Sequence, residues 1–252
     1  MDRDAVMDTA SPIMLATGLR KRYGETEALR GLSFRIVAGE VVGLLGPNGA
    51  GKTTTLKILL GLLRPTEGQA RILDLDCTTQ SREVKERIGY CPDEPAFYDF
   101  LTGRETLDFC ARVRGIDRET AWARLDPLVE RFDFRSQLDA LTHGYSHGMK
   151  KKLALLCALI HGPRVLLLDE PTNGLDPHIA HEVRVYLGER AAEGAAVLVS
   201  THLLDMADRL CDRILILNKG TLLAEGTPAR VRQVAGAEAD ATLEDAFLKL
   251  CA

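Results

Sequence analysis

The sequence lacks a long apolar run and a secretory leader. Its longest apolar stretch, residues 153–160, is far shorter than the ~20 residues that a membrane-spanning helix needs. Residues 1–12 carry acidic side chains and no apolar segment, so they do not fit the pattern of a signal peptide. We therefore expect a cytoplasmic chain without a membrane span, in which residues 1–12 form a flexible tail.

Paired cysteines and clustered metal ligands are also missing. The six cysteines show no Cys-x-x-Cys pair, which favours free thiols in or near the core of a protein kept in a reducing compartment. His178 and His181 lie three residues apart on a predicted helix, but no third ligand accompanies them at metal-site spacing. A solvated helix face is therefore a better interpretation of this histidine pair than a metal site.

An excess of basic residues is absent as well. The chain has 32 Lys and Arg against 36 Asp and Glu, for a net charge of −4. A protein that binds nucleic acid needs basic side chains to neutralise phosphates, so we expect no nucleic-acid partner. Hydrophobic residues make up 46% of the 252 residues, which suffices for one large α/β domain or for a core with an inserted subdomain.

The order of the predicted elements favours the second arrangement. Residues 13–45 are rich in β-strand signals, whereas residues 99–160 space their apolar side chains three and four apart, as helices do. Strand-like runs return at 165–168, 196–199 and 214–217, separated by helical stretches. This alternation predicts a mostly parallel sheet with crossover helices, interrupted by a helical insertion.

The most specific motif spans Gly46 to Thr53 and reads Gly-Pro-Asn-Gly-Ala-Gly-Lys-Thr, which fits Gly-x-x-x-x-Gly-Lys-Ser/Thr. Glycines let successive backbone N–H groups point inward at phosphate oxygens, and a helix that starts at the loop adds its positive dipole end. Lys52 can reach the β- and γ-phosphates, and the Thr53 hydroxyl can bind Mg²⁺. A plain glycine-rich turn is the alternative, but the apolar strand 41–45 and the helix 54–60 flank the motif as a phosphate loop requires.

Two carboxylates follow the apolar run at 165–168. Asp169 stands where a parallel strand ends, the edge at which open α/β sheets place ligands, so it can hold Mg²⁺ through water. Glu170 points differently and can take a proton from an attacking water. A solvated strand end is the alternative, and the phosphate loop upstream favours the catalytic interpretation.

A third motif, Tyr145-Ser-His-Gly-Met149, precedes an apolar helix. Ser146 is a good N-cap, and the helix start leaves backbone N–H groups free for an anion. The N-cap role is by itself a sufficient explanation. The order of the three motifs along the chain is nevertheless distinctive.

With these motifs, the chain from about residue 15 to 250 resembles the nucleotide-binding subunit of ATP-binding cassette (ABC) transporters. The phosphate loop matches Walker A, residues 165–169 match Walker B, and the serine motif takes the place of the signature Leu-Ser-Gly-Gly-Gln. Residues 173–176 match the D-loop, and His202 matches the switch histidine. Tyr23 stands where the family stacks an aromatic ring on adenine.

The resemblance implies a set of site residues for ATP and Mg²⁺. Catalytic roles fall to Lys52, Glu170 and His202, and metal binding falls to Thr53, Asp93 and Asp169. Nucleotide contacts fall to Tyr23, Gly46, Pro47, Asn48, Gly49, Ala50, Gly51, Lys52, Thr53, Thr54, Ser146, Gly148 and Asp176.

The implied fold is α/β: a P-loop NTPase core with a mostly parallel sheet, an N-terminal antiparallel β subdomain and an inserted α-helical subdomain. We expect one ABC ATPase domain over residues 13–252, with its core in 13–98 and 162–252 and the helical insertion at about 99–161. The tail at 242–250 is predicted to form a capped amphipathic helix.

Two positions depart from the family pattern. Asp93 stands where the family has a glutamine that contacts Mg²⁺ and the attacking water, so an additional negative charge is expected near the γ-phosphate. His147 replaces the first signature glycine, and we expect its side chain to point away from the nucleotide. Ser146 and Gly148, which contact phosphate in the family, are kept.

The resemblance also implies partners. In the family, Ser146 would cap the ATP of a second cassette, so we expect a homodimer or a pair with a paralogous cassette. A transporter needs separate transmembrane permease subunits, which would hold this chain on the inner face of the membrane, and the motif set resembles bacterial exporters of the ABC-2 type. Residues 94–102 carry three aromatics that either pack the insertion or dock a permease.

The alternative class is a soluble ABC ATPase that does not transport, for example one that serves iron–sulfur assembly. Translation-type members carry two cassettes in one chain and DNA-repair members insert long coiled coils, so this chain fits neither. A P-loop kinase or small GTPase does not account for the signature motif, the D-loop or His202.

Overall fold

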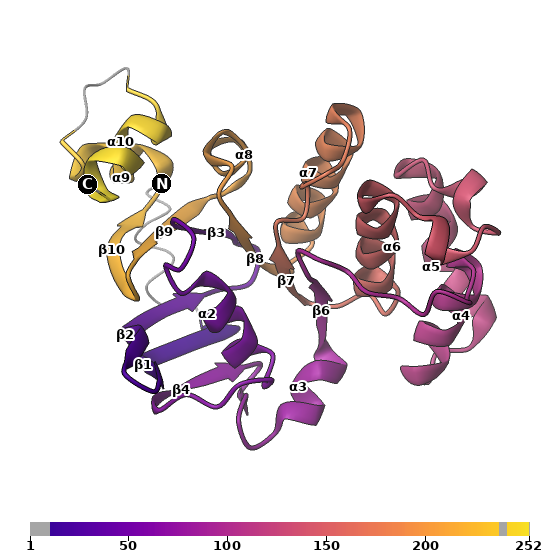
Figure 1. Ribbon diagram of the computed structural model, residues 1–252, viewed down its shortest axis with the longest axis horizontal. Helices are drawn as coiled ribbons and strands as arrows, with labels where there is room; N and C mark the ends of the chain where they lie inside the picture. The colour runs from indigo at the N-terminus through magenta and orange to yellow at the C-terminus, as the bar shows by residue number, and fades with distance from the viewer. Residues whose placement is uncertain (1–10, 237–240, 252) are drawn as a thin grey trace.

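The computed structural model describes residues 11–236 and 241–251 of the chain. Figure 1 shows two sheets on one side of the molecule and a layer of helices on the other. The strands are β1 (Met14–Tyr23), β2 (Thr26–Ile36), β3 (Val41–Leu45), β4 (Glu67–Ile72), β5 (Leu75–Asp76), β6 (Ile88–Cys91), β7 (Val165–Asp169), β8 (Ala196–Thr201), β9 (Arg213–Asn218) and β10 (Thr221–Gly226). The α-helices are α2 (Lys52–Leu59), α3 (Ser81–Arg87), α4 (Gly103–Val113), α5 (Arg118–Arg131), α6 (His147–Leu159), α7 (Pro177–Ala192), α8 (Leu204–Leu210), α9 (Pro228–Val234) and α10 (Leu243–Cys251).

The larger sheet has six strands in the order β10-β9-β3-β8-β7-β6. Neighbours from β9 to β6 run parallel, and β10 alone pairs antiparallel, with β9. Every residue of β3, β7 and β8 is buried, because helices cover one face of these strands and the smaller sheet and α2 cover the other. Such strands appear in a sequence as short continuous apolar runs, which is why their positions were predicted correctly.

The smaller sheet is antiparallel, in the order β2-β1-β4-β5. The long β1–β2 hairpin contains register shifts near Ala16–Leu19 and Lys21–Arg22. Its β2 strand begins at Thr26, because backbone pairing with β1 extends the strand through residues without clear alternation. The α/β class with an N-terminal antiparallel sheet and a mostly parallel second sheet is confirmed.

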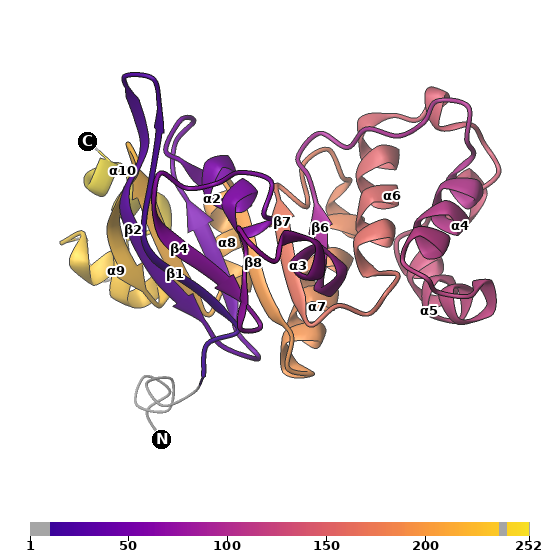
Figure 2. The same ribbon diagram turned by 90° about the horizontal axis from the view of Figure 1, so that it is seen from below.

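Three helices, α4, α5 and α6, occupy the chain between β6 and β7 and form a separate layer (Figure 2). Their core includes the fully buried Phe132 and Phe134, and the Tyr145 hydroxyl donates to Gln137 O at 2.5 Å. Arg131 of α5 joins this layer to α7, because its guanidinium donates to Glu182 Oε2 at 2.9 Å. The helical layer is therefore joined through α7 to the six-stranded sheet, which α7 contacts at β3 and β8.

The remaining expectations have mixed outcomes. The C-terminal helix is confirmed as α10, and Thr242 and Asp245 exchange the hydrogen bonds of a capping box.

All six cysteines are free thiols, yet the sulfurs of Cys110 and Cys157 lie 3.5 Å apart between α4 and α6, a proximity that their spacing of 47 residues did not indicate. Residues 1–10 of the expected tail lie outside the described residues. Within the described ranges, no helix has both the length and the apolar character needed to cross a bilayer.

Candidate active site

The loop at 46–53 joins β3 to α2, as its sequence predicts. Gly49 and Gly51 have φ angles of 79° and 109°, a left-handed conformation that favours glycine. A Cβ on Gly51 would lie 2.8 Å from Ala28 O, and one on Gly46 would overlap Leu217 O. The first intrahelical N–H bond reaches Gly51 O from Thr55, so the N–H groups of Lys52, Thr53 and Thr54 have no helical acceptor. The loop therefore presents backbone donors that suit phosphate oxygens.

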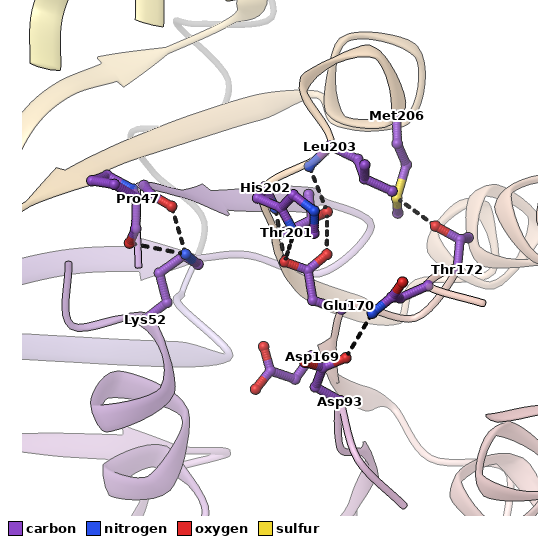
Figure 3. Close-up of polar contacts among 12 residues, drawn as sticks. Pro47, Lys52, Asp93, Asp169, Glu170, Thr172, Thr201, His202, Leu203 and Met206 are labelled. Carbon is purple, nitrogen blue, oxygen red and sulfur yellow. Dashed lines mark hydrogen bonds and ion pairs between the residues drawn. The ribbon is translucent and has the colours of Figure 1, made fainter. Parts of the chain in front are cut away.

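The Lys52 amine lies inside this loop (Figure 3). Its Nζ donates to Gly46 O at 2.5 Å and to Pro47 O at 3.3 Å, and the residue is 9% exposed. Burial lowers the pKa of Lys52, whereas the charges of Glu170 and Asp169 act in the opposite direction. Those two carboxylates are therefore close enough to influence the amine, so the loop and the end of β7 belong to one site.

Asp169 ends β7 and is almost completely buried. Burial raises the pKa of its carboxyl group, and the neighbouring charges of Asp93 and Glu170 raise it further. Figure 3 shows this carboxylate pointing toward the helix that carries Lys52. Carboxylates that repel one another in a buried place are the kind of donors that a divalent cation stabilises.

The residues present fit Mg²⁺ only together with a nucleotide. In the part of the chain that the structure describes, no group of three or more His, Cys, Asp or Glu side chains could hold a metal ion. Thr53, Asp93 and Asp169 offer one hydroxyl and two carboxylates at the same edge of the sheet, and Mg²⁺ commonly completes its shell with phosphate oxygens and water. This donor set suits a cation that arrives with the phosphates.

Glu170 follows β7 in a left-handed conformation, with φ of 46°. Thr201 Oγ1 donates to its Oε2 at 2.7 Å, and the backbone N–H of His202 donates to its Oε1 at 2.8 Å. The Nδ1 atom of His202 lies 2.6 Å from the same Oε1. An ionised carboxylate only accepts, so this contact is a hydrogen bond in the tautomer whose Nδ1 carries the proton. The geometry holds both side chains in fixed positions beside Asp169 (Figure 3).

Asp93 lies just beyond the end of β6, next to the end of β7. Its Oδ1 accepts a hydrogen bond from Asn173 Nδ2 at 3.3 Å and lies 3.5 Å from Lys151 Nζ. The sequence placed Asn173 in the D-loop without indicating a contact with Asp93, and it did not single out Lys151. A signal for Lys151 existed, since it shares the buried face of α6 with Leu155 and Ala158, four and seven residues later.

Three expected nucleotide contacts, Ser146, Gly148 and Asp176, lie at the starts of α6 and α7 and not in the loop, and a fourth, Tyr23, lies on β1. Ser146 caps α6 by accepting from Met149 N at 3.3 Å, and Asp176 caps α7 by accepting from Ile179 N at 3.0 Å. In Figures 1 and 2, β6 and β7 lie between α2, which follows the loop, and α6, which Ser146 caps. The Tyr23 ring, on β1, is 49% exposed, with Lys21 Nζ 5.3 Å from its centroid.

The start of α6 contacts the turn that follows Glu170. A Cβ on Gly148 would lie 2.5 Å from Gly174 O, and a Cβ on Gly174 would overlap the ring of His147. Gly174 has φ of 75°, so glycine satisfies both the conformation and the space at this point. The imidazole of His147 is thereby packed on Gly174.

The segment at 94–102 is partly packed against the core and partly exposed. Phe97 packs against the core of the helical layer, whereas Tyr98 and Phe100 are 58% and 73% exposed. The Tyr98 ring lies 5.6 Å from that of Phe100 and 6.0 Å from that of Phe109 in α4, measured between centroids. We call Tyr98, Phe100 and Phe109 the aromatic patch.

Comparison with known proteins places this site in a family. The family model described as ABC transporter matches residues 29–173. The chain is 41% identical over 210 residues to the Nod factor export ATP-binding protein I of Burkholderia lata, covering 83% of this chain and 69% of that protein. It is 39% identical over 238 residues to the daunorubicin resistance ATP-binding protein DrrA3 of Streptomyces coeruleorubidus, covering 94% and 75%.

Solved structures of ABC transporter cassettes share the fold of this chain. A structure described as the ATP binding subunit of an ABC transporter superimposes with a TM-score of 0.89 at 33% identity, covering 94% of this chain and 99% of that one. The dimeric structure of MJ0796, a bacterial ABC transporter cassette, gives a TM-score of 0.77 at 26% identity, covering 85% and 98%.

Proposed function

The chain belongs to the ABC transporter family of ATP-binding proteins, and from that premise we propose that it hydrolyses MgATP to power an exporter whose membrane subunits are separate chains. The observation that carries the proposal is the meeting of the phosphate loop, the buried Asp169 and the Glu170–His202 pair at one edge of the six-stranded sheet. Relatives named for export of a Nod factor and for daunorubicin resistance support the exporter class over a non-transport ATPase.

ATP binding follows from the loop side of the site. The backbone N–H groups from Asn48 to Thr54 surround the phosphates, and Lys52 exchanges its bonds to the Gly46 and Pro47 carbonyls for bonds to the β- and γ-phosphates. Tyr23 is exposed and offers its ring as a stacking surface for adenine. Thr53 and Asp93 would hold Mg²⁺ directly and Asp169 would hold it through water.

The chemical step depends on the strand ends. Bound Mg²⁺ supplies charge neutralisation at the phosphate oxygens. Glu170 orients the attacking water and accepts its proton, while Thr201 and His202 hold the carboxylate in place. His202 turns its remaining ring nitrogen toward the γ-phosphate and stabilises the charge that spreads over its oxygens. Positioning and electrostatics thus account for the catalysis.

A second cassette completes each site. Ser146 and Gly148 lie at the start of α6, and β6 and β7 lie between α6 and α2, so these two residues suit an ATP bound to another copy in head-to-tail orientation. The helix N-terminus at Ser146 would face the γ-phosphate across the interface, and Asp176 would lie in the adjacent D-loop. A cassette with the same fold is dimeric, which supports this arrangement. The partner is a second copy or a paralogue.

The aromatic patch is the proposed docking surface for a permease. Exposed aromatic clusters of this kind suit a protein interface, and the patch follows Asp93 closely in the chain. Docking there would hold the protein at the inner face of the membrane. It would also bring the permease near Asp93, one of the residues that would hold Mg²⁺.

The test is a pull-down with a trapped protein. The Glu170→Gln variant, loaded with ATP in host membranes and then solubilised, is expected to co-purify with a polytopic membrane protein. Recovery of a soluble complex or of cluster-assembly proteins would favour the non-transport class instead. The same pull-down with the Phe100→Ser variant separates specific docking from non-specific capture.

A further inference from the structure

Lys151 is a buried charge that the reaction described above does not use. It lies in α6, five residues after Ser146, and its side chain is 0% exposed. Lysine is almost never fully buried unless it is paired, because removing an ammonium group from water is costly. The groups around its Nζ atom should therefore explain why it is there.

Backbone carbonyls take up all of its donors. Nζ donates to Pro92 O at 2.9 Å, to Asp93 O at 2.7 Å and to Asp169 O at 3.3 Å, which matches the three N–H donors of an ammonium group. These oxygens lie at or just beyond the ends of β6 and β7, neighbouring parallel strands that pair through Cys91 and Leu168. Lys151 thus links the carboxyl ends of two strands to the helix that follows Ser146.

The same amine also faces a carboxylate. Nζ lies 3.5 Å from Asp93 Oδ1, and Asn173 Nδ2 donates to that oxygen from the other side. The Asp93 side chain is 42% exposed, so the carboxylate reaches the surface of the site while Lys151 stays beneath it. Asp93 is therefore held between α6 and the turn after Glu170.

The balance of charge makes this contact significant. Asp93, Asp169 and Glu170 bring three carboxylates to the place where the phosphates of ATP would bind, and Lys52 is engaged by the phosphates themselves. Lys151 Nζ lies 3.5 Å from Asp93 Oδ1, so its positive charge offsets that of Asp93 from within the protein.

We propose that Lys151 is a positioning residue of the ATPase site, which holds the Asp93 carboxylate in place and offsets its charge so that the phosphates of ATP can bind beside it. The proposal rests on the proposed function. Because its amine is fully buried, Lys151 acts through Asp93 and the strand ends and does not contact the nucleotide. Without it, an unpaired Asp93 would repel the nucleotide, most strongly when no metal is present.

The test is a double-mutant cycle on nucleotide binding without metal. A fluorescent ATP analogue is titrated in excess EDTA into the wild-type protein, Lys151→Met, Asp93→Asn and the double variant. We expect Lys151→Met to weaken binding about tenfold and the added Asp93→Asn change to return it to within about twofold of Asp93→Asn alone, a coupling typical of residues in contact. This readout is independent of hydrolysis, and a purely structural role in satisfying carbonyls would not show the rescue.

Two further variants of Lys151 serve as controls for this cycle. Lys151→Arg keeps the charge and should keep wild-type affinity, and Lys151→Gln replaces Lys151→Met in the cycle if the latter does not fold. Independent, additive effects of the two changes, or wild-type affinity in Lys151→Met, would overturn the proposal while leaving the ATPase assignment intact. A wild-type protein that binds no ATP even with Mg²⁺ would overturn both.

Discussion

The two sides of the site are built in different ways. The loop side, residues 46–53, consists of backbone donors that glycines place, with one lysine side chain inside. The strand-end side consists of side chains from separate segments, with Asp93 after β6, Glu170 after β7 and His202 after β8. The first side depends on space around the backbone and the second on charge, so substitutions should affect them differently.

Gly46→Ala should break the loop side and have the largest effect. The added Cβ would overlap Leu217 O, which belongs to the backbone and cannot rotate away. We expect a loss of about 3 kcal/mol in the free energy of unfolding and no measurable ATP binding, as checked by thermal melts and nucleotide titration. Gly188→Ala, in α7, is the matched control, since a Cβ there meets nothing within 4 Å; it should leave ATP binding unchanged and raise the free energy of unfolding by about 0.5–1 kcal/mol, because alanine is a better helix former than glycine. Equal stability of the two variants would contradict the steric account.

His202→Ala should affect the strand-end side alone. The backbone N–H of His202 and the Thr201 hydroxyl would still hold Glu170, so the fold and the ATP KM should stay near wild type. Loss of the ring removes a charge-stabilising group from the transition state, and we expect kcat to fall about 100-fold. Phosphate-release kinetics measure kcat and KM of this variant. A change confined to KM would show that the imidazole serves ATP binding instead.

Asp169→Asn should stabilise the nucleotide-free protein. A carboxyl group whose pKa is raised on folding binds its proton more tightly in the folded state, so its ionised form costs stability above that pKa and acidification relieves the cost. The neutral amide removes this cost, so we expect a larger free energy of unfolding and a higher Tm at neutral pH, measured by thermal melts. Asp205→Asn, at an 81% exposed side chain, is the control expected to change little. A lower Tm for Asp169→Asn would refute the electrostatic description of this edge.

Phe100→Ser should have the smallest effect on the isolated protein. The ring is 73% exposed and lies on neither side of the site, so stability should change by less than about 0.5 kcal/mol and basal ATPase activity should persist. Only co-purification with membrane protein should be lost. Phe132→Ser, at a fully buried ring, provides the contrast, with an expected cost of about 3–5 kcal/mol.

Local patterns explain what the sequence could predict. Strand β3 was predicted at its observed bounds, 41–45, because a short buried strand leaves a continuous apolar run between turn signals. The phosphate loop and the Ser146 cap are likewise local motifs. The fold class followed from the order of such elements.

Long-range side-chain contacts could not be predicted in the same way. Lys151 lies 58 residues from Asp93 and 18 from Asp169, and nothing in its own neighbourhood indicates which carbonyls it binds. The Glu170–His202 contact spans 32 residues, and the family resemblance assigned a role to each residue without predicting that they touch. Tertiary packing, which brings the ends of parallel strands together, decides these contacts.

The most direct test of the account is the mass and nucleotide content of Glu170→Gln with MgATP, measured by light scattering after size exclusion. If Glu170 is the base of a head-to-tail cassette dimer, the variant should become a stable dimer that retains two ATP molecules, with turnover reduced at least about 100-fold. Adding Ser146→Arg should keep ATP binding but abolish the dimer. A Glu170→Gln protein that hydrolyses ATP at the wild-type rate, or that binds MgATP and stays monomeric, would contradict the central claim.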